Sequence, residues 1–214
     1  MANKFLRNIA ASVLVESTIV IPILLLLVFG TIDATYMLYD WALANKAAYV
    51  GARLAVVSNP VAQNITSSTN YTSGQLQNMG QLCFDSSGAA TGNCYSTGLV
   101  SCTSTSCVPN TYGFTSANFT SILTAMQRIY CPGVQSANCR LKAANVTVSY
   151  QTNGTGFVGE PGGLPMNVTV SITGLTHEFY FIGPLMKIFG GTFANVANIP
   201  TFATTLPSED MATN

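Results

Sequence analysis

One histidine and a few scattered carboxylates are the side chains through which this chain could act as an acid or a base. Nucleophilic catalysis requires a base close to a nucleophile, and His177 is the only base of the usual kind. No serine or cysteine motif of a hydrolase accompanies it, so we expect an exposed loop histidine and not a catalytic one. Asp85, Glu160 and Glu178 lie in dissimilar contexts and form no glycosidase-like pair. The glycine-rich GTGFVGEPGG at 154–163 lacks the strand-to-helix setting of a phosphate loop. The sequence therefore predicts a protein that is not an enzyme and uses no cofactor.

Six cysteines are the other reactive side chains, and all of them lie between residues 83 and 139. An even number of cysteines in a loop-rich segment is typical of disulfides in an exported domain. Zinc binding is the weaker interpretation, because there is no Cys-x-x-Cys pair and His177 is distant in sequence. We therefore predict no metal site and disulfide bonds, with the pairing open, among Cys83, Cys94, Cys102, Cys107, Cys131 and Cys139.

Another carboxylate, that of Glu16, lies inside an apolar segment. Val13–Ile32 supplies 20 positions with one charge, and a helix needs about 20 residues to cross a hydrocarbon core. A carboxylate in the bilayer costs a few kcal/mol unless it is paired or lies near the interface. Glu16 is therefore either an interfacial residue near the cytoplasmic face or one half of an ion pair inside an assembly. Pro22 predicts a bend or a loosened turn in the same helix.

The charges around this segment predict its orientation. Lys4 and Arg7 precede it, and the next basic residue is Lys46, so the positive-inside rule places the N-terminus in the cytoplasm. The bulk of the chain is then exported. A cleaved secretory signal is the main competing interpretation, but the apolar run is longer than a usual signal core and no clear small-x-small cleavage site follows it.

Two stretches together resemble a known family: ASVLVESTIVIPILLLLVFGTIDA at 11–34 and WALANKAAYVGARLAVV at 41–57. The shared features are a basic start, small and apolar residues leading to Glu16, an apolar run ending near Phe29-Gly30, and the Gly51-Ala52-Arg53 segment. This ordered combination resembles the TadE-like family, the minor pilins or pseudopilins of the tight-adherence (Tad, Flp, type IVc) pilus. The resemblance implies a single-pass inner-membrane protein with a periplasmic C-terminal domain, which can join an extracellular pilus after assembly.

The resemblance also implies roles for individual residues. A prepilin peptidase would cut between Ala11 and Ser12, which makes Glu16 the fifth residue of the mature chain. Glu16 would then meet the free N-terminal ammonium of a neighbouring subunit during assembly. Ala11 stands where the family usually has glycine, and Ser17 stands where it usually has an aromatic residue. The implied partners are other pilin subunits, the Tad assembly machinery, the prepilin peptidase and the lipid bilayer.

The helix that carries these residues should continue well beyond the membrane. We expect a cytoplasmic leader at 1–11 and one long helix at 12–58, because Ser58-Asn59-Pro60 supplies a stop signal. An apolar stripe at helical spacing should pack on the exported domain. The stripe consists of Tyr36, Tyr39, Leu43, Ala47, Val50, Leu54 and Val57.

The remainder predicts an α+β domain with a small antiparallel sheet of about three strands. Residues 59–143 should form a loop-rich, cysteine-containing region with a short helix near 117–130. Within 144–214, apolar and polar residues alternate in NVTVSYQ at 145–151 and NVTVSIT at 167–173, the period of half-buried strands. Residues 199–206 are the best third strand, at an edge because of Pro200.

A short helix near 183–190 should be inserted between the second and third strands. Pro184 can begin it and Gly190-Gly191 can end it. Its bulky apolar residues either fill the core or form an exposed patch for subunit or membrane contact. These residues are Leu185, Met186, Ile188 and Phe189.

Composition narrows the possible functions. Charged residues make up only 7% of the 214 positions, against about 25% in an average soluble protein, and acidic and basic residues balance. No basic surface for nucleic acid is therefore expected. The function that the sequence favours is a minor pilin or pseudopilin that is anchored in the inner membrane and helps to assemble an adhesion pilus through its N-terminal helix. The alternative is a permanently anchored periplasmic or surface binding protein.

Overall fold

The structure is a computed structural model that describes residues 2–65, 79–94, 98–134, 136–160, 164–188, 196–208 and 211, with only the backbone of residues 2–14. The chain divides into two compact units. The first unit comprises Met1–Trp41 and Thr176–Asn198, and the second comprises Ala42–Leu175 and Ile199–Asn214. Each unit is described separately below.

A single helix, α1 (Ala2–Val57), begins in the first unit and ends in the second. It continues without interruption through Pro22, where the sequence predicts a bend or a loosened turn. Its most apolar 18-residue window has a mean hydropathy of 2.3, and none of that window is buried inside the protein. The core helix of a soluble protein would be mostly covered, so α1 has the length, composition and exposure of a membrane anchor.

The second unit contains the predicted small antiparallel sheet, which has five strands where about three are expected. In sheet order the strands are β2 (Cys107–Val108), β1 (Val100–Cys102), β3 (Val146–Thr152), β4 (Met166–Ile172) and β7 (Phe202–Pro207). The alternating segments form β3 and β4, and the expected third strand is β7, at an edge. Strands β1 and β2 were not expected, because two or three residues are too few to show a strand period.

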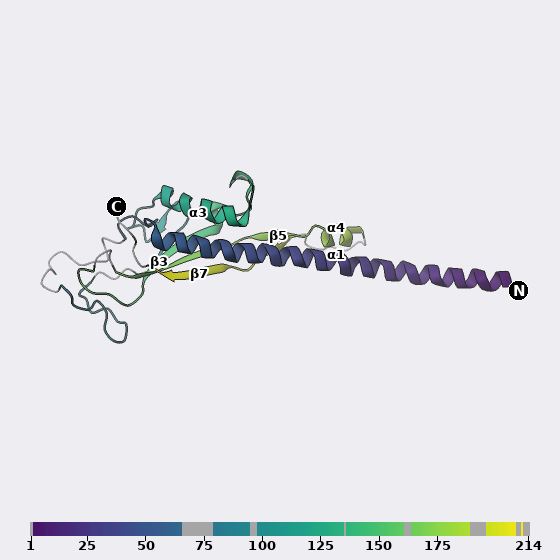
Figure 1. Cartoon of the computed structure of the whole chain (residues 1–214), viewed down its shortest axis with the longest axis horizontal. Coiled ribbons are helices and arrows are strands. Elements are labelled where there is room, and N and C mark those ends of the chain that lie inside the picture. Colours follow the sequence, from purple (N-terminus) through teal and green to yellow (C-terminus); the bar gives the residue numbers. More distant parts are fainter. Residues whose placement is uncertain are drawn as a thin grey trace. The chain divides into compact units, whose positions relative to one another are not determined.

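One face of this sheet is apolar and is covered by helices (Figure 1). Buried and half-buried residues alternate along most of β3 and along β4, with the serines and threonines on the half-buried face. The expected short helix near 117–130 is α3 (Ser116–Tyr130), which buries Phe119, Ile122 and Met126 in the same core. Two short 3-10 helices, Ser136–Asn138 and Ala143–Asn145, connect α3 to β3. The result is a two-layer domain with one hydrophobic core.

The end of α1 packs into this core through a face that only partly overlaps the expected stripe, since Leu43 and Leu54 are half-buried against the core. Tyr36, Tyr39 and Val57 are each more than half exposed, and only Ala47 of the expected stripe is fully buried. The buried positions are instead small: Ala44, Ala47, Ala48, Gly51, Ala52 and Ala55. Small side chains occupy the buried face because they let the helix backbone approach the sheet and α3 closely. Large side chains would prevent this approach.

The first unit adds a short segment to the N-terminal part of α1. Strands β5 (Thr176–Glu178) and β6 (Val196–Asn198) form a two-stranded antiparallel sheet. The expected helix near 183–190 is α4 (Ile182–Ile188). The side chains of Met186 and Ile188, Phe189, and the predicted stop at Gly190-Gly191 lie outside the described part of the chain.

Candidate functional site

Two acidic residues of α1, Asp33 and Asp40, organise the first unit. A separation of seven residues is close to two helical turns, so both carboxylates lie on one face of the helix, about 10 Å apart. Residues 176–188, here called the strap, contact that face. The strap contains β5 and α4, and its polar groups meet both carboxylates. This pairing was not predicted from the sequence, although two aspartates at helical spacing in a mostly apolar helix were a usable signal.

Asp33 is completely buried and accepts hydrogen bonds from three consecutive backbone amides of the strap. The amide of Ile182 donates to Oδ2 at 2.8 Å, that of Phe181 donates to Oδ2 at 3.0 Å, and that of Tyr180 donates to Oδ1 at 3.2 Å. These amides precede or begin α4, where a helix has no internal acceptors for its N–H groups. Asp33 therefore caps α4 from a different helix, and the partial positive charge of the α4 terminus stabilises the buried carboxylate.

Asp40 holds the only histidine of the chain. Its Oδ2 lies 2.7 Å from Nδ1 of His177, whose side chain is 1% exposed. The expectation of an exposed loop histidine is therefore wrong: His177 is in β5 and is covered, because Asp40 supplies a polar partner that the local sequence does not reveal. In the described residues, its Nε2 is buried without a hydrogen-bond partner. The pair links β5 to α1.

Aromatic rings complete the contact between the strap and α1. The rings of Phe29 and Phe181 stack with centroids 5.1 Å apart and an interplanar angle of 11°. The Tyr36 and Tyr180 rings meet edge to face at 6.1 Å. The helix face from Phe29 to Asp40 therefore alternates ring and carboxylate contacts, which joins the strap to α1 in one register.

The residues that the resemblance singles out all lie on α1. Ala11 and Ser12 are within the helix, and their side chains are outside the described part of the structure. The Glu16 side chain is exposed, as are most of the apolar side chains that follow it up to Val28. Glu16 is therefore open to contact from outside the chain.

Gly51 marks a close contact of α1 with α3 and β4 inside the second unit. A Cβ atom built at Gly51 would lie 2.6 Å from Sδ of Met126 on α3 and 3.3 Å from Cγ1 of Val170 on β4. Only glycine fits between those two side chains without displacement.

Tyr150 makes a buried polar contact in the same core. Its hydroxyl accepts a hydrogen bond of 2.9 Å from the backbone amide of Val61, just beyond the end of α1. Burial raises the pKa of Tyr150 to about 12, although the Val61 hydrogen bond acts in the opposite direction. Burial thereby favours the neutral phenol. The hydrogen bond holds the segment that follows α1 against β3.

The six cysteines form three disulfides between neighbours in the sequence: Cys83–Cys94, Cys102–Cys107 and Cys131–Cys139. This confirms the disulfide prediction and supplies the pairing that the sequence left open. Cys102–Cys107 joins β1 to β2, and Cys131–Cys139 closes the turn after α3. Each bond pins a short segment that has too few apolar residues to order itself.

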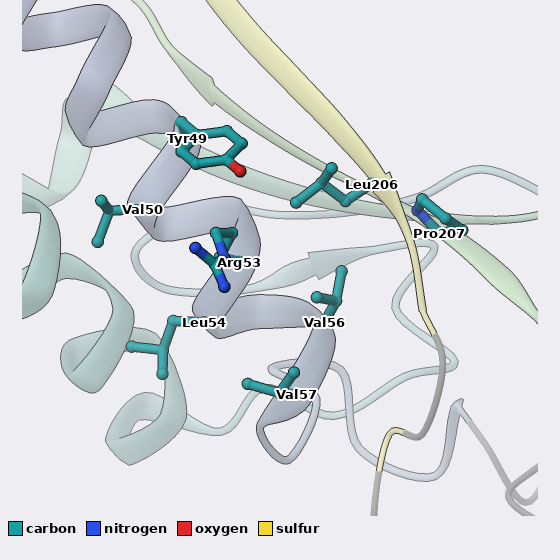
Figure 2. Close-up of a pocket in the computed structure, with 8 residues that line it drawn as sticks. All are labelled: Tyr49, Val50, Arg53, Leu54, Val56, Val57, Leu206 and Pro207. Carbon is teal, nitrogen blue, oxygen red and sulfur yellow. The ribbon is translucent and has the colours of Figure 1, made fainter.

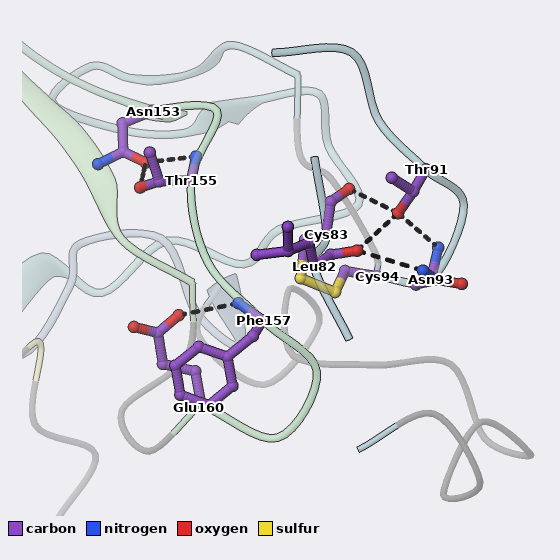
Figure 3. The surroundings of a disulfide bond; sticks show 9 residues. All are labelled: Leu82, Cys83, Thr91, Asn93, Cys94, Asn153, Thr155, Phe157 and Glu160. Carbon is purple, nitrogen blue, oxygen red and sulfur yellow. Dashed lines mark hydrogen bonds between the residues drawn. A yellow bond between two sulfur atoms is a disulfide. The ribbon is translucent and has the colours of Figure 1, made fainter. Parts of the chain in front are cut away.

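Figure 3 shows the Cys83–Cys94 disulfide and its surroundings. The bond belongs to a small second core with Phe84, Val158 and Leu164. The Thr91 hydroxyl donates to the carbonyl of Leu82 at 2.8 Å, beside the disulfide. The hydroxyl of Ser87 and the amides of Ala89 and Ser87 donate to Asp85 and lower the pKa of its carboxyl group. The loop is thus held by one covalent bond and several local hydrogen bonds.

An open hollow lies where the end of α1 faces the end of β7 (Figure 2). The guanidinium carbon of Arg53 is 5.9 Å from the centroid of the Tyr49 ring, within the range of a cation–π contact. The remaining lining is apolar: Val50, Leu54, Val56, Val57, Leu206 and Pro207. Exposed Arg and Tyr beside apolar side chains are typical of protein contact surfaces.

Fold and site together define a class of protein: one exposed, membrane-length apolar helix whose C-terminal part is built into a small disulfide-bonded antiparallel domain. The model of the family described as TadE-like protein matches residues 11–53. The match confirms the resemblance over this segment, which contains Glu16, Asp33, Asp40 and Gly51. A search of the curated proteins found no match, and neither did a search of the solved structures.

Proposed function

We propose that this protein is a minor pilin or pseudopilin of a tight-adherence pilus. The TadE-like segment already indicates a pilus-associated protein of a structural and not an enzymatic kind. The observation that carries the more specific proposal is the exposure of the part of α1 that precedes Phe29, the first α1 residue in ring contact with the strap. Val15, Ile19, Ile23 and Leu27, at four-residue spacing, are each about 60% exposed or more: 61%, 59%, 62% and 63%. This surface suits lipid in the stored state and helices of other pilin subunits in the assembled state.

Glu16 sets the stagger of α1 relative to the same helix in a neighbouring subunit. Removal of residues 1–11 by a prepilin peptidase exposes a new ammonium group at Ser12, which meets Glu16 of a neighbouring subunit. At an effective dielectric of about 20 and a separation of about 4 Å, the attraction is about 4 kcal/mol before desolvation is subtracted. An unpaired carboxylate in an apolar bundle is costly, so only one stagger of neighbouring helices is favoured.

The charges and the disulfides support the proposed membrane placement. Lys4 and Arg7 hold the N-terminus in the cytoplasm, so that α1 crosses the inner membrane once and the second unit is periplasmic. Three disulfides in that unit suit an oxidising compartment. The Tad assembly machinery then extracts α1 from the bilayer together with the domain attached to it.

Two measurements test this function. The intact mass of the purified protein should correspond to a chain that starts at Ser12. Pili from cells that carry Glu16→Ala or Glu16→Gln should incorporate the subunit poorly, and Gln separates the charge from the volume of the side chain. Ser17→Ala, at the adjacent position, is the matched control and should incorporate normally.

Normal incorporation of Glu16→Gln would disprove only the pairing role of Glu16. An uncut N-terminus together with absence of the wild-type protein from purified pili would disprove the pilin role. The same pair of results would favour the alternative, a permanently anchored binding protein, for which the exported domain alone is functional.

A further inference from the structure

The strap lies at the depth of the apolar segment of α1. Its Phe181 ring stacks on Phe29, and Cδ1 of Ile182 is 3.9 Å from the position of a Cβ at Gly30. Phe29 and Gly30 belong to the apolar run that ends at Ile32. At a rise of 1.5 Å per residue, Phe29 is about 4.5 Å inside the end of that run. If α1 spans a bilayer, Phe181 and Ile182 reach the same level.

The backbone of the strap is suited to an apolar environment at this level. Unsatisfied amides in hydrocarbon cost several kcal/mol each, but the Tyr180, Phe181 and Ile182 amides all donate to Asp33. Pro184, in the first turn of α4, has no amide hydrogen to satisfy. The carboxylate is itself buried beneath the strap, so neither its charge nor these three amides face lipid.

The outward-facing side chains of residues 180–187 within the strap also match a membrane interface. The side chain of Phe181 is 40% exposed and that of Tyr180 is 59% exposed, although each ring is in contact with α1. Tyrosine is enriched where acyl chains meet headgroups. Lys187, near the end of α4, is exposed and is the only Lys or Arg of the strap. Its long side chain can reach a lipid phosphate while the helix lies on the acyl boundary.

We infer that residues 180–187 form a second membrane contact, an interfacial element that inserts Phe181 and Ile182 into the leaflet from which α1 emerges and places Lys187 among the phosphates. The occupant of this surface is lipid, because the surface continues the apolar segment of α1 without a gap. The inference rests on the membrane placement of α1 proposed above. Because Asp33 and Asp40 tie the strap to α1, this element fixes how deeply the helix is seated.

Depth-dependent fluorescence quenching of the full chain tests this inference. In a Trp41→Phe background, single tryptophans replace Phe181, Ile23 or Phe157, and the proteins are reconstituted into phosphatidylethanolamine and phosphatidylglycerol vesicles. A fraction of the lipid is brominated near the headgroup end of its acyl chains. Phe181→Trp should lose at least half as much fluorescence as Ile23→Trp. Phe157→Trp is the matched control, since Phe157 is also 40% exposed, and it should respond to aqueous acrylamide instead.

The outcomes separate the two proposals. If Ile23→Trp is quenched by brominated lipid but Phe181→Trp responds only to acrylamide, or to neither quencher, the strap faces water or protein and this inference is wrong. If Ile23→Trp is not quenched either, the membrane placement of α1 and this inference fall together. Tyr180→Trp provides a second reporter on the same surface if Phe181→Trp does not fold.

Discussion

Asp40 and His177 are 137 residues apart in the sequence, and their side chains are joined by a 2.7 Å contact between Oδ2 and Nδ1. Only 13% of the Asp40 side chain and 1% of the His177 side chain are exposed. Loss of Asp40 leaves a buried imidazole nitrogen without this acceptor, which costs about 1–3 kcal/mol. Asp40→Ala should therefore lower the unfolding temperature in detergent.

A double-mutant cycle with His177→Phe isolates the pair. We expect a coupling energy of about 0.5–3 kcal/mol, because the second substitution removes the group that the first leaves unpaired. Additive effects would show that the two side chains stabilise the protein independently.

The hydrogen bonds of Asp33 predict a graded local effect. Asp33→Asn keeps one acceptor oxygen, whereas Asp33→Ala keeps none, so amide hydrogen exchange at Tyr180, Phe181 and Ile182 should accelerate modestly in the first variant and strongly in the second. The amide of Val61, which donates to Tyr150 in the other unit, serves as the internal control. Equal protection of the strap in all three proteins would show that Asp33 does not cap α4.

The close contact at Gly51 predicts a loss of stability on addition of one methyl group. Gly51→Ala places its Cβ 2.6 Å from Sδ of Met126, and overpacking of this kind costs about 1–3 kcal/mol, offset in part by about 1 kcal/mol of helix propensity. Thermal unfolding should show the loss, and Met126→Ala should reduce it by making room. Gly98→Ala is the matched control, because a Cβ there has no neighbour within 4 Å. If both glycine variants unfold alike, α1 and α3 are not closely packed.

The raised pKa of Tyr150 predicts a loss of stability in alkali. The unfolded phenol deprotonates near its ordinary pKa of 10.0 and the folded one near about 12, so the contribution is complete below pH 10 and is lost as the pH rises to about 12. The difference corresponds to about 3 kcal/mol. Unfolding by urea should therefore become easier across this window.

Tyr150→Phe checks the assignment of the alkaline effect. The variant should lack this part of the pH dependence, yet be less stable at neutral pH by about 1–3 kcal/mol because the Val61 amide loses its acceptor. An unchanged alkaline slope in the variant would assign the effect to other groups.

Features with a local cause could be predicted from the sequence. The end of α1 at Val57, the alternation along β3 and β4 and the edge position of β7 all follow from local stop signals, strand periods and proline, which neighbouring residues display directly. The start of α1 at Ala2, ten residues before the expected helix, does not. The TadE-like segment was also recognisable, because its residues are consecutive. The cysteines indicated disulfides because all six lie close together in the sequence.

Tertiary structure alone decided which of these elements meet. The small-residue face of α1 is buried because the sheet and α3 approach it closely. The spacing of residues along a helix does not reveal how closely other elements will approach it. The strap reaches Asp33 and Asp40 across more than 130 residues, and the hydrogen bonds that turn an expected loop histidine into a buried one come from that distant contact. The sequence thus determined what each segment is, whereas long-range packing chose its partners, because the free energy of a contact depends on both surfaces at once.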